Sequence, residues 1–97
     1  MSAGVRIPQV ADIRAAIELY WRKTEIGTND ICGLFKVSRE RAAKLKAVAR
    51  AEMNERKTVN YNAMCVNTAV AYESWGLRID DLERRLTKLQ KLKEAQV

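Results

Sequence analysis

Basic side chains are concentrated in one part of this 97-residue chain, between positions 36 and 57. That stretch holds eight lysines and arginines against three glutamates, a net charge of +5. By contrast, residues 1–35 are neutral, residues 58–77 carry −1 and residues 78–97 carry +2. Because ammonium and guanidinium groups bind phosphates, a basic balance fits nucleic acid, a membrane surface or an acidic partner. Its concentration on one predicted helix favours a polyanion that docks at a defined site.

The residue types that common enzyme and metal sites need are missing. The chain has no histidine, which excludes Ser-His and Cys-His nucleophile pairs and every zinc site that contains His. Cys32 and Cys65 are too few for a four-thiolate site, and we interpret them as reduced thiols in a reducing cytoplasm. Asp80, Asp81 and Glu83 are typical of a helix's first turn, where acids complement the helix dipole. We therefore predict no enzymatic activity, no metal and no cofactor.

Length and composition predict one small globular domain. A hydrophobic content of 47% and two tryptophans argue against disorder, although 31% of the residues are charged. No apolar run approaches the length that spans a membrane, and the start of the chain lacks the hydrophobic stretch of a signal peptide. The sequence therefore predicts a cytoplasmic protein without a membrane partner.

Helical periodicity predicts the element that precedes the basic stretch. A first helix is expected to begin between Pro8 and Asp12, since proline is tolerated in a first turn and an acid suits the N-terminal end. The same helix is expected to end at Gly27. Its apolar stripe would comprise Val10, Ile13, Ile17, Tyr20 and Trp21.

The basic stretch is itself predicted to be a helix that follows a short helix and a tight turn. The short helix would begin at Thr28 or Asn29, either of which can cap it, and would lead into a turn at residues 35–37. Ser38 would then cap the long helix, which extends to Lys57. Its core-facing stripe would comprise Ala42, Leu45, Ala49 and Met53, with Val48 beside it.

The C-terminal part is predicted to hold two more helices. Residues 58–66 alternate in polarity, which leaves a strand, a wing and a loop open. A short helix would be capped by Asn67 and run through Trp75. A last helix would begin near Asp80, which has capping-box spacing to Glu83. Its apolar seam, spaced as in a short coiled coil, would comprise Ile79, Leu82, Leu86 and Leu89, widened by Leu92.

One segment has the spacing of a known DNA-binding motif. Residues 28–47, TNDICGLFKVSRERAAKLKA, have apolar side chains at the motif's fourth, eighth, tenth, fifteenth and eighteenth positions, which are Ile31, Phe35, Val37, Ala42 and Leu45. The fifth position, where two helices cross closely, is the small residue Cys32, and Ser38 stands where the second helix needs its cap. The segment resembles the helix-turn-helix of bacterial and phage transcription regulators, over about a fifth of the chain.

The resemblance has one departure, at the ninth position of the motif. Regulators of this type usually have glycine there, because the turn often needs a positive φ angle, and this chain has Lys36. A residue other than glycine costs about 1–2 kcal/mol in the left-handed region. Lys36 therefore allows a turn whose geometry differs slightly from the usual one.

The resemblance implies a set of DNA contacts, with the second helix of the motif in the major groove. The side chains that it places at base edges are Ser38, Arg39, Glu40, Ala43, Lys44 and Ala47. Arg39 can make a forked contact to guanine, Glu40 can accept from cytosine, and the alanine methyls can meet a thymine methyl. Thr28 and Asn29 would hold a phosphate at the start of the first helix. The expected phosphate neighbours are Lys36, Arg41, Lys46 and Arg50.

The sequence thus predicts an all-α protein with a helix-turn-helix DNA-binding region at residues 1–57 and a C-terminal helical dimerisation region at residues 58–97, within a single compact domain. The expected function is that of a sequence-specific regulator of bacterial or phage type, which binds double-stranded DNA as a homodimer. The predicted dimer interface comprises Trp75, Ile79, Leu82, Leu86 and Leu89.

Several alternatives fit the same residues. The charged helix face can be the solvated face of an ordinary helical bundle, and the leucine seam can close the core of the monomer. A phage DNA-packaging or assembly subunit can use the same motif within a larger oligomer, and an adaptor can bind a protein partner through the basic helix. A dimer favours the regulator, whereas a ring of many subunits favours packaging.

Overall fold

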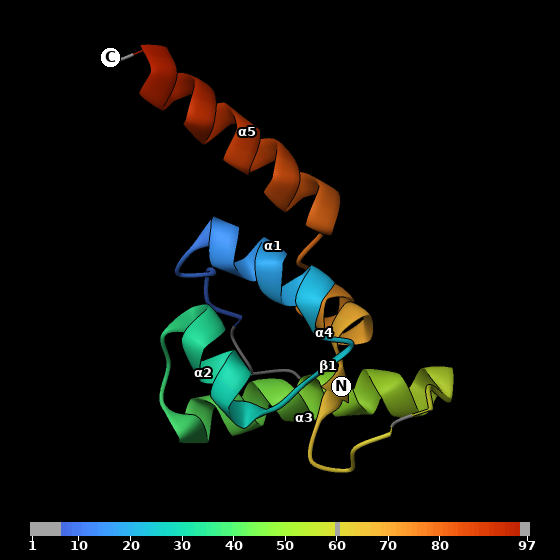
Figure 1. Cartoon of the computed structure of the whole chain (residues 1–97). Coiled ribbons are helices and arrows are strands. Elements are labelled where there is room, and N and C mark those ends of the chain that lie inside the picture. The colour runs from blue at the N-terminus through green and yellow to red at the C-terminus, as the bar shows by residue number, and fades with distance from the viewer. Residues whose placement is uncertain (1–6, 60, 96–97) are drawn as a thin grey trace.

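The chain forms five helices and one small antiparallel sheet in the part that a computed structural model describes, residues 7–59 and 61–95. The elements follow in the order α1 (Ile13–Arg22), β1 (Glu25–Ile26), α2 (Thr28–Phe35), α3 (Arg39–Arg56), β2 (Val66–Asn67), α4 (Thr68–Ser74) and α5 (Ile79–Ala95). The predominance of helices confirms the predicted all-α class (Figure 1). Among the helices of this part, none is both long and apolar enough to cross a membrane.

The first helix begins where the sequence predicts but ends earlier. The Asp12 carboxylate accepts a hydrogen bond from the Ala15 N–H at 3.2 Å and caps α1. The prediction that this helix continues to Gly27 is wrong, because α1 ends at Arg22 and the residues after it pair as β1 with β2. Helical periodicity cannot reveal a pairing partner so far along the chain.

The small sheet joins the two halves of the chain. Glu25 lies opposite Asn67 and Ile26 opposite Val66 in antiparallel register. Ile26 and Val66 are fully buried, so the sheet is part of the core. Since β2 leads directly into α4, this pairing also fixes where α4 begins.

The buried strip of α1 differs from the expected one. Ala16 and Leu19 are buried, whereas Trp21 of the expected stripe is 64% exposed. The Tyr72 hydroxyl of α4 donates to the Ala16 carbonyl of α1 at 2.6 Å. Burial, with a smaller contribution from nearby Asp30, raises the pKa of this hydroxyl above its usual value. The remaining members of the expected stripe are half-buried, namely Val10, Ile13, Ile17 and Tyr20.

The short helix α4 packs against α3 and completes the core. Asn67 caps it as predicted, by accepting from the Val70 N–H at 3.0 Å. Trp75 follows its last turn and is 4% exposed, and the indole Nε1–H donates to the Leu45 carbonyl of α3 at 2.9 Å. The indole also meets Phe35 of α2 edge-on, with ring centroids 5.3 Å apart. Trp75 therefore holds α4 against both helices of the predicted motif.

The last helix, α5, leaves the body on the side opposite α3. It packs against α1, and Figure 1 shows α1 between α5 and the pair formed by α2 and α3. The molecule is therefore elongated, with extents of 47 × 24 × 22 Å. Because α5 begins at Ile79, Asp80 lies inside its first turn, and the expected capping box between Asp80 and Glu83 is wrong.

Candidate nucleic-acid interface

The turn between α2 and α3 contains the left-handed residue that glycine usually supplies. Lys36 has φ 56° and ψ 53°, and its N–H donates to the Cys32 carbonyl. The Val37 N–H donates to the same carbonyl at 3.2 Å, so two hydrogen bonds close the turn. The chain therefore tolerates left-handed strain of about 1–2 kcal/mol at Lys36 instead of adopting a different turn.

The apolar positions of the motif lie where the sequence predicts. Four of them are buried between α2 and α3, namely Ile31, Phe35, Ala42 and Leu45. Val37 is half-buried and packs against the same core. Because core residues fix α2 against α3, the outer face of α3 is presented rigidly.

The start of α2 is capped by Gly27, so the prediction that Thr28 or Asn29 caps it is wrong. The Gly27 N–H donates to the Asp30 carboxylate at 3.1 Å, and the same carboxylate forms an ion pair with Lys23 at 3.0 Å. Asp30 thus supplies an acceptor for the Gly27 N–H, which has no partner within the helix. Thr28 and Asn29 lie inside the first turn, from which their side chains reach α3.

Two side-chain hydrogen bonds join the start of α2 to α3. The Arg39 guanidinium donates to Asn29 Oδ1, and Lys46 Nζ donates to Thr28 Oγ1 at 2.9 Å. The first turn of α2 therefore lies along one side of α3. This places the two predicted phosphate-binding positions next to the predicted base-reading helix.

The first half of α3 presents the predicted base-reading residues to solvent. Ser38 caps the helix as predicted, since its hydroxyl accepts from the Arg41 N–H at 3.3 Å. The exposed residues are Ser38, Arg39, Glu40, Ala43, Lys44 and Ala47. Helical geometry arranges them as a continuous strip on the side away from the buried Leu45.

The four cations that were expected to face phosphates fall into two groups. Lys36 and Arg41 are exposed, on the turn and on the first turn of α3. Lys46 and Arg50 are half-buried instead. The Arg50 guanidinium donates to the carbonyls of residues 63 and 65 at 2.7 and 2.9 Å. Lys46 donates to the carbonyl of residue 64 at 3.1 Å.

Lys46 and Arg50, which were expected to neighbour phosphates, thus make hydrogen bonds to their own chain. They hold residues 61–65, here called the exposed loop, on the flank of α3. Tyr61 and Met64 of this loop are 88% and 72% exposed. Of the strand, the wing and the loop that the sequence allowed for residues 58–66, residues 61–65 form a loop. The sequence feature that sets this loop apart is the lack of any charged residue from position 58 to position 65, directly after the basic helix.

The predicted dimer interface is divided between the core and the surface. Trp75 and Leu82 are each 4% exposed and belong to the core of the monomer, which corrects their assignment to a subunit contact. The reason is that the end of α4 packs against α3, and the start of α5 packs against α1. Ile79 and Leu86 are half-buried, and Leu89 is 47% exposed. The apolar seam therefore becomes accessible only toward the end of α5.

No protein-family model matches the chain, and no curated protein or solved structure matches it significantly. Within the described residues, no group of His, Cys, Asp and Glu side chains is arranged to hold a metal ion. The strip on α3 combines a guanidinium, an ammonium, a carboxylate and methyl groups on one exposed surface. Such a surface can attract a polyanion and also discriminate between donor and acceptor patterns on it.

Proposed function

We propose that the protein binds double-stranded DNA and acts as a sequence-specific regulator of the bacterial and phage type. The observation that carries this proposal is the exposed strip on the first half of α3, which lies next to the first turn of α2. The opposite face of the same helix is buried along its length. A helix supported in this way can enter the major groove without losing its place in the core.

The residues of the strip have separate roles in this proposal. Arg39 makes a forked contact to guanine, and Glu40 accepts from cytosine. Ala43 and Ala47 are exposed methyl groups that can meet a thymine methyl. Lys44, also exposed, adds a cation in the middle of the strip.

Phosphate contacts come from the residues that border the strip. Thr28 and Asn29 approach a phosphate with their side chains and with the first-turn amides of α2. Lys36 and Arg41, both exposed, add positive charge on either side. Lys46 and Arg50 act indirectly, because their hydrogen bonds hold the exposed loop beside α3.

We propose further that the protein acts as a homodimer that pairs through the outer half of α5. Leu89 and Leu92 are 47% and 59% exposed there. Leu86 and Leu89 also line an open groove together with Ile13 and Arg14 of α1. A second copy of α5 in a two-fold contact would cover the leucines and fill this groove.

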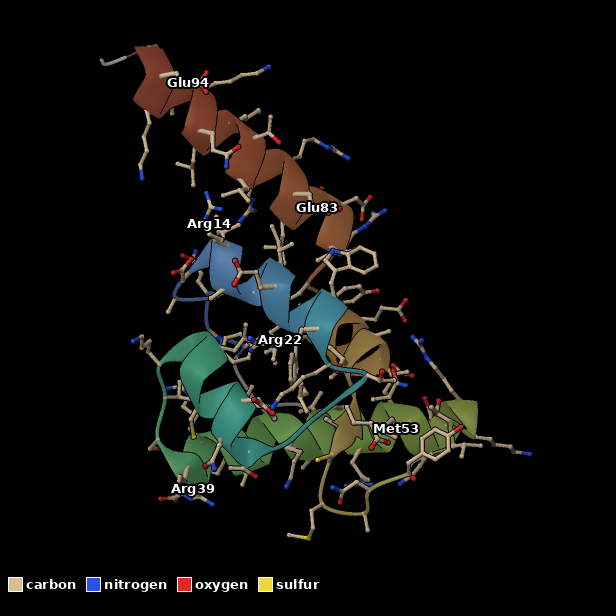
Figure 2. The ribbon with its side chains drawn as sticks, in the orientation of Figure 1. Arg14, Arg22, Arg39, Met53, Glu83 and Glu94 are labelled. Carbon is tan, nitrogen blue, oxygen red and sulfur yellow. The ribbon has the colours of Figure 1, made fainter. Side chains whose placement is uncertain are left out.

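The position of α5 makes this pairing compatible with DNA binding. Figure 2 shows Arg39 at one end of the molecule and Glu94 at the other, with α1 between them. A two-fold axis through the outer half of α5 therefore leaves both copies of α3 uncovered. If the axis runs along the length of the molecules, so that the copies lie side by side, the two α3 helices would lie about 34–36 Å apart in the DNA complex, in successive major grooves.

The test is a DNA-binding titration with variants of the strip, using duplexes of defined and random sequence. Arg39→Ala and Lys44→Ala should each reduce the discrimination between sequences, by about 1–3 kcal/mol for a lost base contact. Lys91→Ala, which removes an exposed cation from α5, is the charge-matched control and should retain the discrimination. If both α3 variants bind and discriminate like the unmodified chain, α3 does not read DNA.

The oligomeric state tests the regulator against the packaging alternative. Size-exclusion chromatography with mass detection should give a dimer. A ring of many subunits would instead favour a DNA-packaging or assembly subunit that uses the same helix.

A further inference from the structure

The backbone of the exposed loop is fixed at almost every residue. The Tyr61 N–H donates to the Glu25 carboxylate at 2.8 Å. Asn62 closes a tight turn, since its side-chain oxygen accepts from the Met64 N–H at 2.9 Å and its carbonyl accepts from the Cys65 N–H at 3.0 Å. With the bonds from Lys46 and Arg50 described above, the loop is held by side chains from β1 and α3. It is therefore a preorganised surface element.

Two large apolar side chains of this fixed loop are exposed to solvent. Tyr61 is 88% exposed and Met64 is 72% exposed. Because the hydrogen bonds above fix the loop backbone, these side chains are held in place where another molecule can cover them. The loop carries no charge, and the two cations beside it, Lys46 and Arg50, donate to its carbonyls. An uncharged contact surface is therefore expected.

The loop is continuous with the proposed DNA interface. Lys46 Nζ donates both to the Met64 carbonyl and to Thr28 Oγ1, so one ammonium group joins the loop to the first turn of α2. Figure 1 shows the loop, in yellow, on the side of α3 away from α1 and α5. A DNA duplex that accepts α3 would therefore also meet the loop.

We infer that the exposed loop is a second DNA contact, in which Tyr61 and Met64 lie against the sugar–phosphate strand and the minor-groove edge of the duplex that holds α3. This inference rests on the proposed function. A helix in the major groove, which is about 12 Å wide, has a sugar–phosphate strand on either side. The loop lies beside α3 at the distance that the Arg50 side chain spans, so it would face one of these strands. Apolar side chains can contact DNA at the minor groove, where in some proteins they insert between base steps.

The contact differs from the rest of the interface in its dependence on salt. Lysines and arginines that neutralise phosphates make binding weaker as salt rises. Tyr61 and Met64 neutralise none. Their contribution to affinity should therefore be the same at every salt concentration.

The experiment uses the full-length double variant Tyr61→Ala/Met64→Ala and a short fluorescent duplex of random sequence, titrated at several salt concentrations. The variant should bind about tenfold more weakly, equivalent to about 1.4 kcal/mol, with an unchanged salt slope. The conservative variant Tyr61→Phe/Met64→Leu should retain the affinity. Trp21→Ala, which removes a 64% exposed ring from α1, is the matched control and should have no effect. Circular dichroism verifies that each variant is folded.

The outcomes separate this inference from the proposed function. If the unmodified chain binds DNA and the double variant binds equally well, the loop is not a DNA contact, and the proposed function stands. A lower salt slope, or a change in oligomeric mass without a change in affinity, would also overturn the inference, because the loop would then act through charge or contact a second copy. If the unmodified chain does not bind the duplex even at low salt, both the proposed function and this inference fail.

Discussion

The two longest helices, α3 and α5, are covered in different ways. α3 has 18 residues and buries Ala42, Leu45, Ala49 and Met53, so its apolar stripe is covered from the first turn to the last. α5 has 17 residues, and Leu82 near its start is the one that is buried. Its stripe continues beyond the body through leucines that are exposed. In the monomer, α3 is thus supported along its length and α5 only at its beginning.

Amphipathic periodicity has a different consequence in each of these helices. Both helices have an apolar stripe, but the stripe does not say what covers it. On α3, the chain's own α2 and α4 cover the stripe, so the opposite, charged face is available for a ligand. On α5, α1 covers the beginning, and the outer stripe is exposed in the monomer. This contrast is why the proposed DNA contact lies on the polar side of α3 and the proposed subunit contact on the apolar side of α5.

The largest expected effect comes from breaking the contact proposed for α5. The double variant Leu89→Glu/Leu92→Glu should be monomeric, because two carboxylates replace exposed leucines at the pairing surface. Because a monomer has only one copy of α3, its binding to a two-site duplex should be weaker by about 10²-fold or more. Sedimentation and a DNA titration measure the two effects.

A control variant with the same change in net charge tests whether the position matters. Thr87→Glu/Lys91→Gln alters exposed residues on the opposite side of α5 and also changes the net charge by −2. It should leave the dimer intact. If the unmodified chain sediments as a monomer at micromolar concentration, the outer stripe of α5 has another role.

A smaller effect is expected when one leucine is truncated on each helix. Leu45→Ala opens a cavity at a fully buried site of α3 and should lower the free energy of unfolding by about 2–5 kcal/mol. Leu92→Ala removes a side chain that is 59% exposed and should change it by about 0.5 kcal/mol or less in the monomer. Urea denaturation at several protein concentrations measures both. A cost for Leu92→Ala that is large and independent of concentration would contradict the contrast between the helices.

Much of the fold could be predicted because its signals are local. The stripe of α3, the Ser38 and Asn67 caps and the Asp12 start of α1 each depend on residues within a few positions of one another. The turn at Lys36 is an exception, because the missing glycine allowed a turn of different geometry, whereas Lys36 itself adopts the left-handed conformation. The exposed strip on α3 follows from the same periodicity.

What could not be predicted depends on contacts between distant segments. α1 ends early because Glu25 and Ile26 pair with β2. Trp75 was predicted at the dimer interface, yet its indole donates to a carbonyl thirty positions earlier in α3. Arg50 carries the charge that suits a phosphate, and only the position of the loop shows that its donors are used by the chain. The sequence pattern identifies the apolar and polar faces of each helix, whereas contacts between distant segments decide which face is covered.

The smallest expected effect concerns the two lysines that end α2 and α3. Lys36 and Lys57 both have φ 56°, in the left-handed region. Replacing either with glycine removes a strain of about 1–2 kcal/mol, and the greater freedom of glycine in the unfolded chain offsets about 0.5–1 kcal/mol of that gain. Lys36→Gly and Lys57→Gly should therefore each stabilise the fold by about 0.5–1 kcal/mol, measured by urea denaturation.

The same pair of variants separates the needs of the fold from those of the ligand. Lys36 is an exposed cation at the proposed interface, so Lys36→Gly should reduce the slope of log affinity against log salt by about 0.9, the contribution of one phosphate contact. Lys57 lies at the far end of α3, about 27 Å away for an 18-residue helix, so Lys57→Gly should leave the slope unchanged. If both variants lower the slope equally, the charge of α3 attracts DNA without a defined docking site. If neither lowers it while both stabilise the fold, Lys36 serves only the turn, and the phosphate contacts lie elsewhere on the strip.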